Sequence, residues 1–138
     1  PLMYNSSVSA SERRRRSIEA LQAVGLGDRL EHKSNQMSGG QMQRVAIARA
    51  LVNNPAVILA DEATGNLDTR TSFEILVLFQ KLHREGRTII FVTHNPELSQ
   101  YSSRTIRLRD GHVIEDTLNP DILSAEKALA ALPKNDED

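Results

Sequence analysis

Four stretches of the chain have the apolar spacing or composition typical of α-helices. They cover residues 9–24, 42–53, 69–84 and 121–132, and the second is expected to start at glycines 39 and 40. Ser9 or Ser11 can cap the first helix, and Gly25 can end it. Gly86 is expected to end the third helix and Pro133 the fourth.

Two short apolar runs with β-branched members lie between these helices, at Ala56–Ala60 and Thr88–Thr93. Such runs are typical of strands covered on both faces in a parallel sheet. A predicted helix connects them, so the order strand, helix, strand indicates an α/β fold. A β-hairpin is expected over 105–116, because Asp110-Gly111 supplies the positive backbone angles of a tight turn.

Titratable side chains follow both apolar runs. Asp61 and Glu62 end the first run and His94 ends the second, so the three groups are expected on one rim of the sheet, where α/β folds bind ligands. A helix cap or a solvated turn is the alternative for an acidic pair taken alone. Gly39 and Gly40 open a helix, where close backbone approach and free N–H groups suit a phosphate, although helix starts and loops use such pairs freely.

Composition narrows the class of protein. The 138 residues are 39% hydrophobic and 25% charged with a formal net charge of −1, which predicts one domain and argues against nonspecific nucleic-acid or membrane binding. Without cysteine there is no disulfide, thiolate nucleophile or cysteine-rich zinc site. The longest apolar run is too short for a membrane helix. The arginines at 13–16 are flanked by Glu12 and Glu19, which favours a solvated helix face over a lipid or nucleic-acid patch.

Five segments follow one another along the chain: Met37-Ser38-Gly39-Gly40-Gln41, Gln43–Leu51, Ile58–Glu62, Gly65-Asn66-Leu67-Asp68, and Val92-Thr93-His94. In order and spacing they resemble the signature motif, the helix after it, the Walker B strand, the D-loop and the switch histidine of the ATP-binding cassette family. Further segments are similar to the macrolide-export and lipoprotein-release subgroup, namely residues 1–4, 29–30 and 106–111. The resemblance implies a parallel-sheet P-loop NTPase core of the RecA-like kind, with a helical subdomain at the N-terminus.

The resemblance also implies roles for individual residues. Asp61 would position Mg²⁺ through water, Glu62 would be the general base, and His94 would contact the γ-phosphate of ATP. The signature residues would bind the nucleotide of the opposite subunit: Ser38, Gly39, Gly40 and Gln41. Asp68 would signal across that dimer interface.

Two departures from the family pattern are expected to have consequences. The family usually has proline after the catalytic glutamate, and Ala63 in its place is expected to loosen the turn. None of the seven glycines begins a Walker A loop, since five residues beyond each comes a residue other than glycine. The chain, which starts at Pro1, is therefore interpreted as the C-terminal half of a cassette, inactive alone. Its expected parts are 1–37 in the helical subdomain, 38–116 in the distal ATPase core, and 117–138 as a helix and charged tail.

The function expected of the parent protein is ATP-driven transport. Its partners would be a second ATPase subunit and a transmembrane permease, with no nucleic acid, and it would lie in the cytoplasm on the inner face of the membrane. Cassette ATPases of DNA repair or of ribosomes are the alternative, as is an inactive fragment. The DNA-repair kind places a coiled coil or zinc modules before the signature, and the 37 residues preceding Ser38 contain neither heptads nor cysteine.

Overall fold

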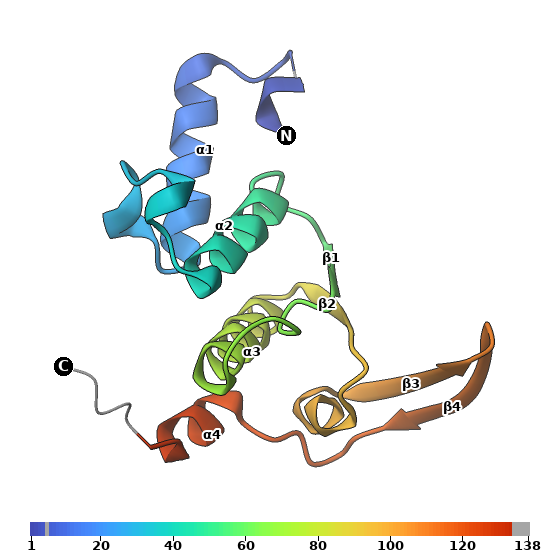
Figure 1. Ribbon diagram of the computed structural model, residues 1–138. Coiled ribbons are helices and arrows are strands. Elements are labelled where there is room, and N and C mark those ends of the chain that lie inside the picture. Colours follow the sequence, from blue (N-terminus) through green and yellow to red (C-terminus); the bar gives the residue numbers. More distant parts are fainter. Residues whose placement is uncertain (5, 134–138) are drawn as a thin grey trace.

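The computed structural model describes residues 1–4 and 6–133, and it has an α/β architecture (Figure 1). The helices and strands are α1 Ala10–Ala23, α2 Gly39–Leu51, β1 Val57–Asp61, α3 Thr69–Arg84, β2 Thr88–Val92, β3 Arg104–Arg109, β4 His112–Leu118 and α4 Ala125–Ala131. Single 3₁₀ turns occur at Leu2–Tyr4, Gly27–Arg29 and Ser34–Gln36, and a longer one, η4, covers Pro96–Tyr101.

Helix α1 is capped and ended as the sequence predicts. Of the two candidate serines, Ser9 is the cap, because its Oγ accepts a hydrogen bond from the amide of Glu12 at 3.2 Å. Gly25 follows the helix with φ of 76°, a conformation that favours glycine.

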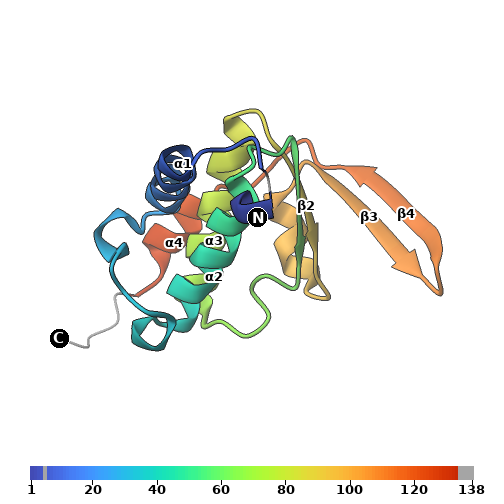
Figure 2. The same cartoon turned by 90° about the horizontal axis from the view of Figure 1, so that it is seen from above.

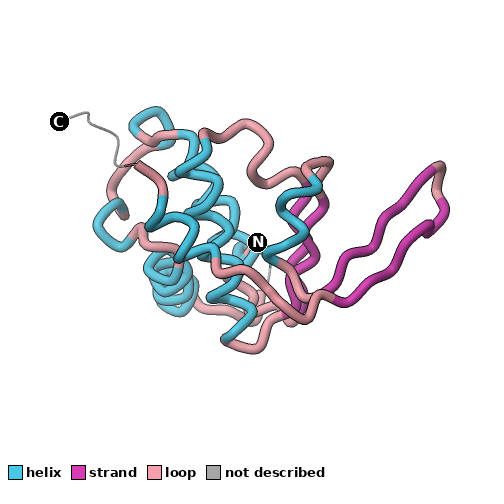
Figure 3. The backbone as a smooth tube through the Cα atoms, turned by 90° about the horizontal axis from the view of Figure 1, so that it is seen from below, coloured by secondary structure: helices cyan, strands magenta, loops and turns pink. Residues whose placement is uncertain are grey.

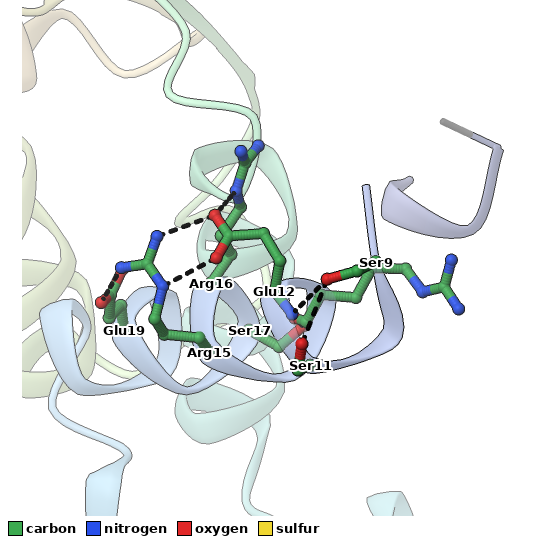
Figure 4. Close-up of polar contacts among 8 residues, drawn as sticks. Ser9, Ser11, Glu12, Arg15, Arg16, Ser17 and Glu19 are labelled. Carbon is green, nitrogen blue, oxygen red and sulfur yellow. Dashed lines mark hydrogen bonds and ion pairs between the residues drawn. The ribbon is translucent and has the colours of Figure 1, made fainter. Parts of the chain in front are cut away.

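The arginine run of α1 forms ion pairs within the helix. Arg15 and Arg16 both donate to the Glu12 carboxylate, and Arg15 also donates to Glu19 (Figure 4). The hydrogen bond from Arg15, followed by that from Arg16, lowers the pKa of Glu12 to about 2. The expectation of a solvated helix face agrees with the side chains of Arg15 and Arg16, which are 59% and 38% exposed.

Strands β1 and β2 pair in parallel from Val57 opposite Thr88 to Asp61 opposite Val92. The prediction that both strands are covered on both faces is wrong. Alternate side chains of β1 are exposed, with Leu59 at 68%, whereas Ile58 is buried. The physical reason is that the helices of the described chain lie to one side of the pair, as Figure 2 shows.

No helix of the described residues is long and apolar enough to cross a membrane.

Strands β3 and β4 form the predicted hairpin, which projects from the rest of the molecule (Figure 3). Both turn residues have positive φ, 50° at Asp110 and 78° at Gly111, so the expectation from Asp-Gly is confirmed. A register shift between Arg107 and Leu108 interrupts the pairing and marks a bulge in the hairpin.

The last helix is shorter than predicted, because α4 begins at Ala125 and not at residue 121. The Gln80 side chain of α3 fixes the backbone of the preceding segment: its Nε2 donates to the carbonyls of Tyr101 and Leu123, and its Oε1 accepts from the amide of Ala125. Ser124 then caps the helix. Residues 134–138 of the predicted charged tail lie outside the described residues.

One hydrophobic core joins the helices to the inner face of β1 and β2. Its most deeply buried large side chains are Ile75 and Leu82 of α3 and Val24 after α1. Arg44 of α2 connects the parts by hydrogen bonds, because it donates to the carbonyl of Val24 at 3.0 Å and to Glu74 of α3 at 3.2 Å. The core therefore fixes the position of α3 between α2 and the strands.

Candidate functional site

Glu62 and His94 lie side by side where the two parallel strands end. The amide of Glu62 donates to the carbonyl of Val92 at 2.9 Å, which continues the pairing one residue past β1. The Glu62 Oε1 atom accepts a hydrogen bond from the His94 amide at 3.0 Å and lies 2.8 Å from His94 Nδ1. The expectation that the two strand ends bring these groups to one rim is confirmed.

The backbone at Glu62 has an unusual conformation, with φ of 48°. Residues other than glycine rarely adopt this left-handed conformation, so the contacts around Glu62 must hold its backbone there. The Glu62 carbonyl accepts from the Gly65 amide at 3.0 Å, and a Cβ on Gly65 would lie only 3.3 Å from Glu62 Oε2. Ala63, which stands where the family that the chain resembles usually has proline, is buried in the core. The hydrogen bond from the Gly65 amide and the burial of Ala63 therefore hold this turn.

A cavity of about 500 Å³ opens beside this pair. Its wall contains Glu62 and His94, further polar side chains, and apolar side chains of α3. The polar side chains include those of Thr64, Thr93 and Asn95 in the loops and Ser72 in α3, and the α3 apolar side chains are those of Phe73 and Leu76. Glu62 and His94 thus lie on a concave surface beyond the carboxyl ends of the strands, where α/β folds bind ligands.

Asp61 is the last residue of β1 and is exposed. The described residues contain no group of three or more histidine, aspartate or glutamate side chains that could hold a metal ion by themselves. Magnesium is commonly bound by one or two carboxylates together with substrate phosphates. The exposed carboxylate of Asp61 supplies oxygen donors of the kind that such a shared site uses.

Residues 38–41 form the capped start of α2. The Gln41 amide donates to Ser38 Oγ at 3.2 Å, and the Ser38 amide donates to Gln41 Oε1 at 3.0 Å, which is a capping box. Gly39 and Gly40 are the first two residues of the helix, so their amides have no carbonyl acceptor within it. This end of α2 presents free N–H groups and the positive end of the helix dipole to an anion.

Asp68 is the N-cap residue of α3. Its carboxylate accepts from the Thr71 amide at 3.0 Å and from Thr71 Oγ1 at 2.5 Å. The hydrogen bond from the Thr71 side chain, followed by that from the Thr71 amide, holds the pKa of Asp68 below its usual range. The loop just before α3 lies against the start of α2, where a Cβ on Gly39 would lie 3.6 Å from Leu67 Cδ2.

The structure therefore gathers the predicted site residues other than Asp61 into two groups, and Asp61 is absent from the cavity wall as the described residues form it. Glu62 and His94 meet at the cavity, whereas residues 38–41 adjoin the Leu67–Asp68 turn and are absent from the part of the cavity wall that the described residues form. Sequence reasoning missed Thr71, whose amide and hydroxyl both donate to the carboxylate of the capping Asp68.

Comparisons with known proteins agree with this geometry. The family model described as "ABC transporter" matches residues 1–65. An ABC transporter ATP-binding protein of Thermotoga maritima is 58% identical over 113 residues, which are 82% of this chain and 48% of that protein. The macrolide export ATP-binding/permease protein MacB of Shewanella sp. is 50% identical over 125 residues, 91% of this chain and 18% of that protein. The chain thus spans about half the length of its ATP-binding relative.

Solved structures give the same result. The dimeric structure of MJ0796, a bacterial ABC transporter cassette, matches with a TM-score of 0.68 and 45% identity over 85% of this chain and 51% of that chain. The ADP conformation of MJ1267, another cassette, matches with a TM-score of 0.77 at 23% identity, over 94% of this chain and 51% of that chain, and supports the fold alone. The ordered motifs, the Glu62–His94 pair at the strand ends and these relatives lead to one conclusion: the chain belongs to the ATP-binding cassette family of transporter ATPases.

Proposed function

We propose that this chain is the C-terminal half of a cassette that couples ATP hydrolysis to transport. In this proposal residues 1–37 belong to the helical subdomain and residues 38–116 form the distal ATPase core. Residues 117–138 form a C-terminal helix and tail. The observation that carries the proposal is the Glu62 carboxylate, which accepts a hydrogen bond from the His94 amide at the edge of a cavity of about 500 Å³.

In this proposal Glu62 is the general base of hydrolysis. Phosphoryl transfer needs an oriented nucleophile and charge stabilisation more than covalent help from the protein. Both contacts from His94 go to Glu62 Oε1, which leaves Oε2 to accept a proton from an attacking water. The imidazole of His94 is 84% exposed, so its ring can reach a phosphate from this position.

Magnesium and the phosphates complete the proposed site. Mg²⁺ would supply charge neutralisation at the β- and γ-phosphates, and Asp61 would hold it through water. The start of α2, residues 38–41, would bind the nucleotide of a second ATPase subunit through its free amides. Asp68, at the adjoining start of α3, would transmit the state of one subunit to the other.

The proposed partners are a second cassette and a transmembrane permease. The structural relative MJ0796 is described as dimeric, and MacB is described as an ATP-binding/permease protein. By analogy, the parent protein would act in the cytoplasm, on the inner face of the membrane, where the permease holds it.

The chain alone is expected not to hydrolyse ATP, because its sequence contains no phosphate-binding loop with glycine and lysine at the required spacing. The test compares Mg-ATP turnover and calorimetric ATP binding of the 138-residue chain with those of the full-length cassette that contains it. Turnover is expected only in the full-length cassette. Steady turnover by the chain alone that Glu62→Gln abolishes would contradict the proposal.

A further inference from the structure

The starts of α2 and α3 approach each other so closely that residue 40 has no room for a side chain. A Cβ built on Gly40 would clash with the Cγ2 methyl group of Thr71. The backbone does not explain this glycine, because residue 40 is helical and its φ lies outside the left-handed region. Within this chain, Thr71 is what excludes a side chain at position 40.

Thr71 cannot move its methyl group away without losing its other contact. The methyl and hydroxyl groups share the Cβ atom, so they rotate together about χ1. The hydroxyl donates to Asp68 Oδ2 at 2.5 Å, and the Thr71 amide donates to Oδ1 of the same carboxylate at 3.0 Å. Rotation that makes room at Gly40 therefore takes the hydroxyl away from Asp68.

We propose that Thr71 is a positioning residue that ties the start of α2 to the Asp68 turn. Its methyl group sets how closely residues 38–40 approach α3, and its hydroxyl holds the Asp68 carboxylate. A shift of the α2 start toward α3 pushes on Thr71 and releases Asp68. This inference rests on the proposed function, since both segments belong to the surface proposed to meet the second ATPase subunit.

The test is a double-substitution cycle in the full-length cassette, with ATPase kcat and KM as the readout. Gly40→Ala adds the clashing Cβ, Thr71→Ser removes the methyl and keeps the hydroxyl, and Thr71→Val keeps the methyl and removes the hydroxyl. Gly40→Ala is expected to lower kcat by about tenfold or more in the Thr71 background, and by less than about threefold in the Thr71→Ser background. In the Thr71→Val background Gly40→Ala is expected to remain costly, because valine keeps a methyl group on Cβ and, being β-branched, has one strongly preferred χ1 in a helix.

Thermal unfolding of the same variants separates coupling from hydrolysis. Gly40→Ala is expected to lower the melting temperature by about 2–8 °C with threonine or valine at position 71, and by about half as much or less with serine. Equal losses from Gly40→Ala in all three backgrounds, in kcat and in melting temperature, would overturn the inference. If the unsubstituted cassette shows no turnover, the proposed function fails, and the thermal cycle alone then decides whether Thr71 couples the two segments.

Discussion

Replacing Glu62 by glutamine is expected to stop ATP hydrolysis in the full-length cassette while leaving the site in place. The amide oxygen of glutamine can still accept from the His94 amide, as Glu62 Oε1 does at 3.0 Å, so the turn and the histidine keep their contact. What is lost is a carboxylate that can take a proton from water. General-base catalysis typically contributes about 10²–10⁴-fold, which corresponds to about 3–5 kcal/mol of activation free energy.

The assay measures steady-state Mg-ATP turnover together with ATP-dependent dimerisation by size-exclusion chromatography. Glu62→Gln is expected to lower kcat by about 10²–10⁴-fold and to accumulate the ATP-bound dimer, because binding contacts remain and hydrolysis does not follow. Glu126→Gln, the same substitution at an exposed position in the first turn of α4, is the matched control and is expected to retain turnover. Near-normal turnover by Glu62→Gln would refute the assignment of the base.

Four further outcomes are expected. His94→Ala slows turnover, because Glu62 Oε1 loses its Nδ1 contact, and kcat measures this. Ile75→Ala lowers the free energy of unfolding of the domain by about 2–5 kcal/mol in denaturant titrations, because the side chain is fully buried. Ionised Asp68 stabilises the fold above its ordinary pKa of 3.8, and this contribution disappears as pH falls through the lower folded-state value, so Asp68→Asn weakens the acid dependence of the melting temperature. The 138-residue chain alone associates through the open edges of β1 and β2, and a monodisperse 15.3 kDa monomer in light scattering would contradict this.

Elements that local chemistry defines were predicted well from the sequence. Helix α3 has the predicted bounds Thr69–Arg84, because Asp68 caps one end and Gly86, with φ of 97°, follows the other. The Asp110–Gly111 turn was predicted for the same kind of reason, since few dipeptides adopt two positive φ angles in succession. The rim shared by Glu62 and His94 also followed, because parallel strands end at one edge of a sheet.

Features that depend on packing between distant segments were not predicted. The apolar run of β1 indicates that both faces can be buried, but which face is covered depends on where the helices lie, and Leu59 is exposed. The start of α4 depends on Gln80, which is 45 positions before Ala125 in the sequence. The contact between Gly40 and Thr71 is likewise a tertiary one, so no local pattern around either residue indicates it.

The three hydrogen bonds of the Gln80 side chain close the base of the β3–β4 hairpin, because they join the segments just before and just after it. Tyr101, where the chain leaves the body, and Leu123, where it returns, are held by the same amide nitrogen, and the Leu123 amide also donates to the Gln100 carbonyl at 2.9 Å. Added chain at the exposed Asp110–Gly111 tip therefore lengthens a loop whose base is already closed, and the entropy cost of such lengthening grows only slowly. A fluorescent reporter or an affinity peptide inserted at this tip is expected to leave the Glu62–His94 cavity and the start of α2 undisturbed. The hairpin tip is therefore a suitable site for labelling this protein.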